Sequence, residues 1–308
     1  MVDGLSLNIA QILFNSLLTG SLYVLAAIGL TLTYGILKFP NVAHAEFITF
    51  GAYIAYTVAD KWKVGFEAGV LAAFIFTGLL GVASHLFLFG PLIKKGTTVL
   101  HLTVASIGYG IVLRYAMQEI WGRKDLYYSA YYPGFDLGPI RVTPLWLSFI
   151  FLAVAIVTIF HLLLTKTKIG KAMRATSNNP ILAQASGIDT RKIVILVWFL
   201  GSALAGLGGV MKASDTRITP VLGWDVLIMC FAAVIFGGVG SIYGTILAGY
   251  TLGFVENLGV IGLVALRLST EYRFLLGFLV LVFALLFAPQ GIAGITFKSM
   301  RRRLSASG

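Results

Sequence analysis

Long apolar stretches without charged residues alternate with short polar segments along the whole chain. About 20 apolar residues are enough to cross the hydrocarbon core of a bilayer as a helix, so each long stretch predicts a transmembrane helix. The ranges free or nearly free of charge are 4–37, 68–93, 96–118, 142–165, 193–211 and 274–297. Residues 226–266 carry one charge, Glu256, and are long enough for two further helices with a turn at 237–240. The pattern predicts an all-α polytopic membrane protein.

A shorter apolar stretch, 47–59, follows a polar segment that contains Pro40, Asn41, His44 and Glu46. Proline disturbs a helix, and a broken helix with polar groups is tolerated at membrane depth only where it is buried in protein or lines a watery cavity. The alternative is a loop at the membrane surface in which Asn41 caps the next helix. We therefore expect eight transmembrane helices if 47–59 is re-entrant and nine if it crosses, with at least one short or broken helix.

Composition supports this class and adds an orientation. Charged residues are 11% of the 308 residues and mean hydropathy is +0.91, whereas soluble domains carry about 25% charged residues. Much of the net charge of +11 lies in residues 165–192 and in the last residues of the chain. Basic segments beside apolar stretches are typical of the cytoplasmic side, so they indicate orientation rather than nucleic-acid binding. Residues 1–297 are predicted to be one transmembrane domain of a cell-membrane protein, and 298–308 a basic cytoplasmic tail.

Cysteine and histidine give no sign of metal or redox chemistry. The single cysteine, Cys230, has no partner for an intramolecular disulfide, and the four histidines are too far apart in the sequence for a local ligand motif. No metal or cofactor is expected in this chain.

Ionisable side chains inside apolar stretches are costly, which makes them functional candidates. Glu256 lies beside Asn257 with no other charge in its stretch, and Glu46 belongs to the polar segment described above. Arg114 lies near the end of its stretch, where snorkelling or pairing with another group accounts for it. The residues predicted to line a solute pathway are Asn41, His44, Glu46, Glu256 and Asn257.

Small residues recur at every fourth position in two of the stretches. They are Gly201, Ala205 and Gly209 in one, and Gly240, Gly244 and Ala248 in the other. Small residues on one face of a helix let two backbones approach closely in lipid. The spacing predicts tight packing, within the chain or against another subunit.

The basic segment 165–192 contains signals for a short helix. Asn179-Pro180 is typical of a helix start, with proline in the first turn, and Gly187 is typical of a helix end. The predicted helix is amphipathic and is flanked by Gly170 and Gly187. Such a helix either docks onto a partner or lies on the lipid surface.

Four parts of the sequence resemble one known family. Gly170, Arg174, Ala183, Gly187, Ile188 and Asp189 resemble the cytoplasmic coupling loop of branched-chain amino acid permeases of ABC importers, although Ile181 replaces the acidic residue that opens the wider motif. Residues 41–46 resemble the Asn-Phe-Ala-His-Gly-Glu run of that family, with Val42 and Ala45 as departures. The glycine-rich run 235–244 and the segment 287–291 are also similar. The likeness covers essentially the whole chain. It is greater to the H-type subunit of that family than to the longer M-type subunit.

The resemblance implies a permease subunit that imports branched-chain amino acids by alternating access. It implies a second, related membrane subunit, two cytoplasmic ATP-binding subunits and an extracytoplasmic solute-binding protein as partners. The six coupling residues above would transmit movement from the ATP-binding subunits. The chain itself is expected not to be an enzyme, because Gly170-Lys171 is followed by Ala172 and no phosphate-binding loop motif occurs in the sequence.

Two alternatives stay open at this point. The same architecture is compatible with urea, short amides or another small polar solute. An ion-coupled secondary transporter that uses Glu46 and Glu256 is the alternative of another class, because isolated acids in transmembrane helices are typical of proton and ion relays.

Overall fold

The computed structural model describes residues 8–130, 132–287, 291–292 and 294. The chain is almost entirely helical, as predicted. Its α-helices are α1 (Ile9–Leu37), α2 (His44–Tyr56), α3 (Phe66–Ser84), α4 (Gly90–Lys94), α5 (Val99–Trp121), α6 (Pro144–Lys166), α7 (Lys168–Asn178), α8 (Pro180–Ala185), α9 (Thr190–Asp215), α10 (Leu222–Gly237), α11 (Ile242–Ala265) and α12 (Arg273–Phe287). The π-helical turns are η1 (Thr57–Lys61) and η2 (His85–Phe89), and η3 (Thr270–Tyr272) is a 3-10 turn.

Six helices in the described residues are long and apolar enough to cross a membrane. They are Ile9–Leu37, Phe66–Lys94, Val99–Trp121, Pro144–Lys166, Thr190–Asp215 and Ile242–Ala265. The other predicted stretches also contain helices, which are shorter as described: α2, α10 and α12. The predicted turn at 237–240 separates α10 from α11, as expected. An all-α membrane protein is therefore confirmed.

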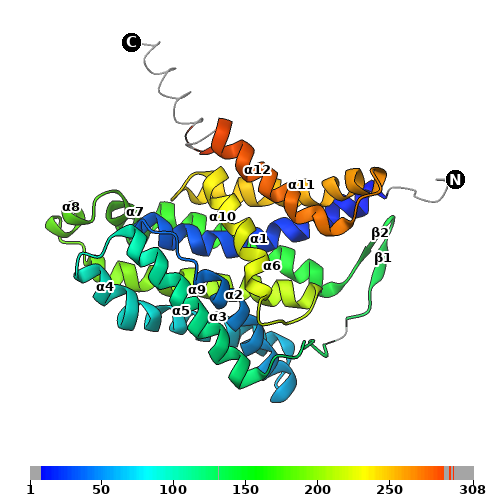
Figure 1. The fold of residues 1–308 in the computed structure, drawn as a ribbon, viewed down its shortest axis with the longest axis horizontal. Coiled ribbons are helices and arrows are strands. Elements are labelled where there is room, and N and C mark those ends of the chain that lie inside the picture. The colour runs from blue at the N-terminus through cyan, green and yellow to red at the C-terminus, as the bar shows by residue number, and fades with distance from the viewer. Residues whose placement is uncertain (1–7, 131, 288–290, 293, 295–308) are drawn as a thin grey trace, which may run out of the picture.

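The two ends of the helix bundle differ in what they carry (Figure 1). At one end, strands β1 (Phe135–Leu137) and β2 (Ile140–Val142) form an antiparallel hairpin. The backbone N–H of Arg141 donates to Oε1 of Gln11 at 2.7 Å, which attaches this hairpin to the start of α1. We call this the hairpin end. The opposite end carries α7 and α8, and we call it the α8 end.

Helices α1 and α9 form the centre of the bundle, because their small residues let neighbouring backbones approach. A Cβ atom at Gly29 would lie 2.2 Å from the carbonyl oxygen of Gly201, and one at Gly244 would lie 1.9 Å from that of Gly237. The predicted close packing therefore occurs within the chain. The outward faces of α5 and α6 expose large apolar side chains such as Val112 and Phe151, as a lipid-facing surface requires.

The polar segment between α1 and α2 lies deep in the bundle. Nε2 of His44 lies 3.0 Å from the carbonyl oxygen of Ala26, within hydrogen-bond distance. At a rise of roughly 1.5 Å per residue, Ala26 lies about 16 Å along α1 from its end at Leu37. Residues 38–43 therefore return into the bundle before α2 begins, which agrees with a short or broken helix. The alternative, in which Asn41 caps α2, is wrong, because the N-cap residue is Ala43 and has no side-chain capping bond.

Candidate functional site

The first turn of α2 places a carboxylate inside the bundle. Glu46 is fully buried, and its Oε1 accepts hydrogen bonds from Nη2 of Arg114 at 2.7 Å and from the indole N–H of Trp224 at 2.8 Å. Arg114 comes from α5 and Trp224 from α10, so this carboxylate joins three helices. The guanidinium of Arg114 also lies 4.9 Å from the centre of the Trp224 ring. Such a pair is stable in a low dielectric only while both partners are present.

Two polar groups of the segment 41–46 have atoms with no hydrogen-bond partner among the described residues. They are the side-chain amide of Asn41, on both its nitrogen and its oxygen, and Oε2 of Glu46. Both side chains are almost completely buried. Buried polar atoms are nearly always bonded to protein or water. A polar solute or a water molecule that reached the segment 41–46 could therefore form hydrogen bonds with these atoms.

Glu256 and Asn257 lie at a different place, on α11 and closer to the hairpin end. Tyr23 donates its hydroxyl proton to Glu256, and Nε of Arg273 lies 3.4 Å from the same carboxylate. Glu256, which has no other charge in its own stretch, is therefore paired with a residue of another helix. Arg273 starts α12, and a sequence separation of this size gives no local signal for the pair. Nδ2 of Asn257 donates to the hydroxyl of Thr19 at 3.1 Å.

The five predicted pathway residues thus form two groups rather than one. Glu256 and Asn257 line a cavity of about 200 Å³ between α1, α6, α9, α11 and α12. The residues lining this cavity include none of Asn41, His44 and Glu46. Sequence reasoning missed the residues that complete each group: Arg114 and Trp224 in one, and Lys212, Asp215 and Arg273 in the other. The charge of Arg114 within the apolar stretch 96–118 is the one sign of this role in the sequence. Its position near the end of that stretch offers another explanation, snorkelling, which hides the sign.

The basic segment 165–192 folds into two helices at the α8 end. The side chain of Asn179 accepts from the backbone N–H of Leu182 at 3.0 Å and caps α8, with Pro180 in the first turn. Gly187 has φ of +83°, as expected for a glycine that ends a helix. The expectation that Gly170 flanks a single helix is wrong, because Gly170 lies inside α7. A Cβ there would be 2.1 Å from the carbonyl oxygen of Leu163, so glycine lets α7 fold back tightly against α6.

Helix α8 presents its apolar residues outward. Ile181 and Leu182 are 79% and 63% exposed, whereas Ala183 is buried. Ile188 follows Gly187 and packs partly against the core. The carboxylate of Asp189 then caps α9 by accepting from the backbone N–H of Lys192 at 3.1 Å, and these bonds lower the pKa of Asp189 below its usual range. Capping therefore fixes the direction in which α9 leaves this segment.

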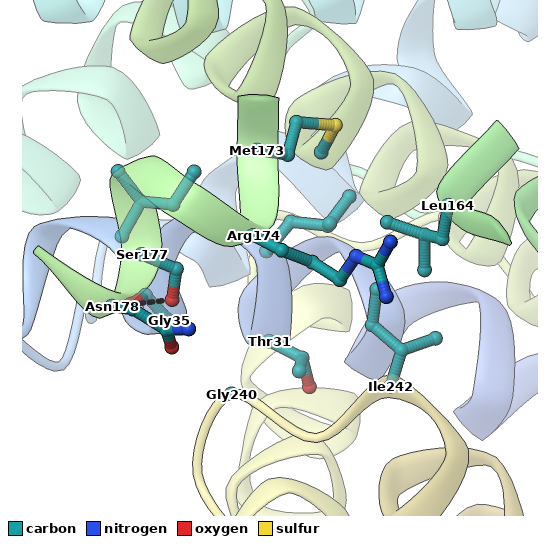
Figure 2. Close-up of a pocket in the computed structure, with 11 residues that line it drawn as sticks. Thr31, Gly35, Leu164, Met173, Arg174, Ser177, Asn178, Gly240 and Ile242 are labelled. Carbon is teal, nitrogen blue, oxygen red and sulfur yellow. Dashed lines mark hydrogen bonds between the residues drawn. The ribbon is translucent and has the colours of Figure 1, made fainter. Parts of the chain in front are cut away.

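Helix α7 connects this exposed surface to the centre of the bundle. The hydroxyl of Ser177 donates to the carbonyl oxygen of Gly35 at 2.8 Å, near the end of α1. Figure 2 shows the guanidinium of Arg174 pointing towards Leu164 and Ile242 over a cavity of about 180 Å³. Gly240, in the turn before α11, also lines this cavity. Helix α7 thus contacts α1, and shares this cavity with α6 and the α10–α11 turn.

Comparison with known proteins places the chain among transport permeases. Residues 12–285 match the family described as branched-chain amino acid transport system, permease component. The chain is 31% identical to the probable branched-chain amino acid transport permease protein LivH of Methanocaldococcus jannaschii, over 96% of each protein. It is 30% identical to the high-affinity branched-chain amino acid transport system permease protein BraD of Pseudomonas aeruginosa, over 92% of this chain and 95% of BraD.

More distant relatives also match most of the chain. The ribose import permease protein RbsC of Escherichia coli is 27% identical over 93% of this chain and 88% of its own length. Among solved structures, PsaBC from Streptococcus pneumoniae in complex with Fab matches with a TM-score of 0.52 and 16% identity, over 92% of this chain and 93% of that one. This likeness supports the fold alone. The family match and the relatives at 30% identity or more show that the chain belongs to the permease components of branched-chain amino acid transport systems.

Proposed function

We propose that this protein is the permease subunit of an ATP-driven importer that moves branched-chain amino acids into the cell by alternating access. The observation that carries the proposal is α8, which holds Ile181 and Leu182 outward on a rigid, capped turn at one end of the bundle. An apolar pair exposed on a short helix fits the surface of a partner protein. A second, related permease subunit, two cytoplasmic ATP-binding subunits and an extracytoplasmic solute-binding protein complete the transporter.

In this mechanism, movement of the ATP-binding subunits reaches the transmembrane helices through α7. Closure of those subunits on ATP shifts α8, and α7 transmits the shift to α1 through Ser177 and to the α10–α11 turn through the cavity lined by Arg174. Helices α1 and α9 pack at the centre, so a shift of α1 changes the access of solute to the pathway. Hydrolysis of ATP on the partner subunits resets the cycle. ATP is bound by those subunits, and this chain supplies no cofactor.

The orientation follows from the positive charges. Lys166, Lys168 and Lys171 lie at the α8 end, which we assign to the cytoplasm. The hairpin end then faces outward, towards the solute-binding protein. Counting α2 with η1 as a crossing, nine transmembrane helices result, with the N-terminus outside and the C-terminus inside. The basic tail, 298–308, and the segment 288–290 that resembles the family lie outside the described residues.

The names of the relatives favour amino acids over other solutes, and the ion pairs inside the bundle argue against an ion-coupled transporter. Relatives of 30% identity or more carry names of branched-chain amino acid permeases, whereas RbsC is named for ribose import, so the architecture serves more than one solute class. The solute bound by the delivery protein encoded with this chain separates these possibilities. The ion-coupled alternative relied on two isolated acids, but Glu46 pairs with Arg114 and Glu256 with Arg273.

The substitution Ile181→Glu tests the coupling role. It puts a charge at the centre of the proposed contact, so we expect ATP-binding subunits to associate more weakly by about 2 kcal/mol, the usual cost of losing an interface hot spot. Uptake into proteoliposomes should fall in parallel. Val64→Glu is the matched control, because Val64 is 63% exposed but lies before α3, far from α8 in the chain.

Co-purification of ATP-binding subunits and uptake of radiolabelled leucine measure the two effects. Unchanged co-purification and uptake in Ile181→Glu, with correct folding shown by size-exclusion chromatography, would contradict the assignment of α8. Uptake that continues without ATP and collapses on adding an uncoupler would contradict the ATP-driven importer itself.

A further inference from the structure

The cavity at the hairpin end contains a cation and an anion that are not paired with each other. Lys212 and Asp215 both line it and belong to the last turn of α9. Residues three apart on a helix have Cβ atoms about 5–6 Å apart. The four ion pairs found among the described residues involve neither side chain. Two opposite charges thus lie side by side at the cavity wall without an ion pair between them. The carboxylate of Asp225, in the first turn of α10, also interacts electrostatically with Lys212.

The remaining charges of the cavity cancel each other. Glu256 is buried in α11, and Arg273 is the first residue of α12. The two side chains form an ion pair, and the hydroxyl of Tyr23 donates a hydrogen bond to Glu256. The lining therefore holds two cations and two anions.

The rest of the wall is mainly apolar, with two amides. The apolar lining residues are Leu18, Leu22, Trp146, Phe149 and Met211. The amides are Asn15 and Asn257. A cavity of this kind, apolar with a few convergent polar groups, is typical of small-molecule sites. Its apolar part suits an aliphatic side chain, and its charged part suits a compact polar head.

We propose that this cavity binds an α-amino acid as its zwitterion, with the carboxylate at Lys212 and the ammonium at Asp215. An α-amino acid carries its two charges on one carbon, so it needs a neighbouring cation and anion, which the last turn of α9 supplies. The aliphatic side chain packs on Trp146, Phe149 and Met211. The proposal rests on the proposed function, since it assigns a first binding position on the outer side of that transporter.

Protection of an engineered cysteine tests the proposal without relying on transport. The single natural cysteine, Cys230, is buried in α10, so Cys230→Ser gives a background without thiols. Asn15→Cys then places a thiol at the cavity wall, and Thr19→Cys is a second position there if the first does not fold. The complete complex in proteoliposomes, without binding protein, is treated with a small neutral maleimide. Leucine at about ten times its Kd is expected to slow labelling by about tenfold.

Ligands that lack one charge identify the two roles. We expect 4-methylpentanoate, which has no ammonium, and 3-methylbutylamine, which has no carboxylate, to give no protection. Lys212→Gln and Asp215→Asn should each abolish protection by leucine. Lys124→Gln is the matched control, because Lys124 is an exposed cation in the loop after α5 that does not line the cavity, and it should keep the full tenfold effect.

The outcomes separate this proposal from the proposed function. Equal protection by 4-methylpentanoate, or full protection in Lys212→Gln, would overturn the zwitterion site. ATP-driven leucine uptake by the same complex, measured in parallel, tests the importer. Uptake without any protection rejects the cavity alone, whereas protection without ATP-driven uptake supports the cavity and rejects the importer.

Discussion

Arg114→Met is expected to lower the free energy of unfolding by about 3–5 kcal/mol, the usual cost of removing one partner of a buried ion pair. Glu46 is fully buried, and Arg114 supplies its positive charge and two of its hydrogen bonds. Without that charge, the carboxylate must stay ionised in a low dielectric or take up a proton. Either outcome weakens the contact of α2 with α5 and α10. Thermal unfolding of the detergent-solubilised complex, followed by size-exclusion chromatography, measures the loss.

A double substitution shows that the loss comes from an unpaired charge. Glu46→Gln keeps an acceptor for the indole of Trp224 but removes the negative charge, so Arg114→Met with Glu46→Gln should recover most of the stability. The double-mutant cycle is expected to give a coupling energy of about 3 kcal/mol, near the top of the range for residues in one network. Arg217→Met is the surface control, because its pair with Asp125 is largely exposed and contributes about 1 kcal/mol or less. Losses of equal size in Arg114→Met and Arg217→Met would refute a buried pair.

The sequence predicted Glu46 as a special residue but not its partner, for a physical reason. An acid surrounded by apolar residues is visible locally, since only its neighbours in the chain are needed to see that it is costly. Its pairing with Arg114 depends on how far residues 38–43 return into the bundle, which is set by packing between distant helices. The same limit explains Glu256, whose partner Arg273 begins another helix.

Local chemistry predicted the structure of the basic segment 165–192 more completely. Asn179, Pro180 and Gly187 act through their own backbone angles and capping bonds, and the structure has each of them in the expected role. Gly170 was misjudged because glycine has two uses. It ends helices, but it also permits a close approach, and at Gly170 it serves the contact of α7 with α6. Choosing between these uses requires knowledge of the neighbouring helix.

Gly209→Ala is expected to cost about 3 kcal/mol, the upper part of the range for overpacking. A Cβ at this position would lie 1.8 Å from the carbonyl oxygen of Ile48, so α9 and α2 would have to move apart. The atom in the way belongs to the backbone and no rotamer change can move it. Ile48→Ala should therefore fail to rescue Gly209→Ala. The melting temperature of the purified complex reports both results.

Substitutions at two other helical glycines are controls, because neither glycine lies against the backbone of another helix. A Cβ at Gly277 would lie 2.3 Å from the sulfur of Met229, but this side chain is flexible and is able to swing away, so Gly277→Ala should be tolerated. At Gly108 on α5 the space is open, and alanine should raise stability by about 0.5–1 kcal/mol through its higher helix propensity. If Gly209→Ala were as harmless as Gly108→Ala, α2 and α9 would not be in backbone contact. In the proposed mechanism this close approach also holds α2, with the buried carboxylate of Glu46, against a helix that begins at the end of the segment 165–192.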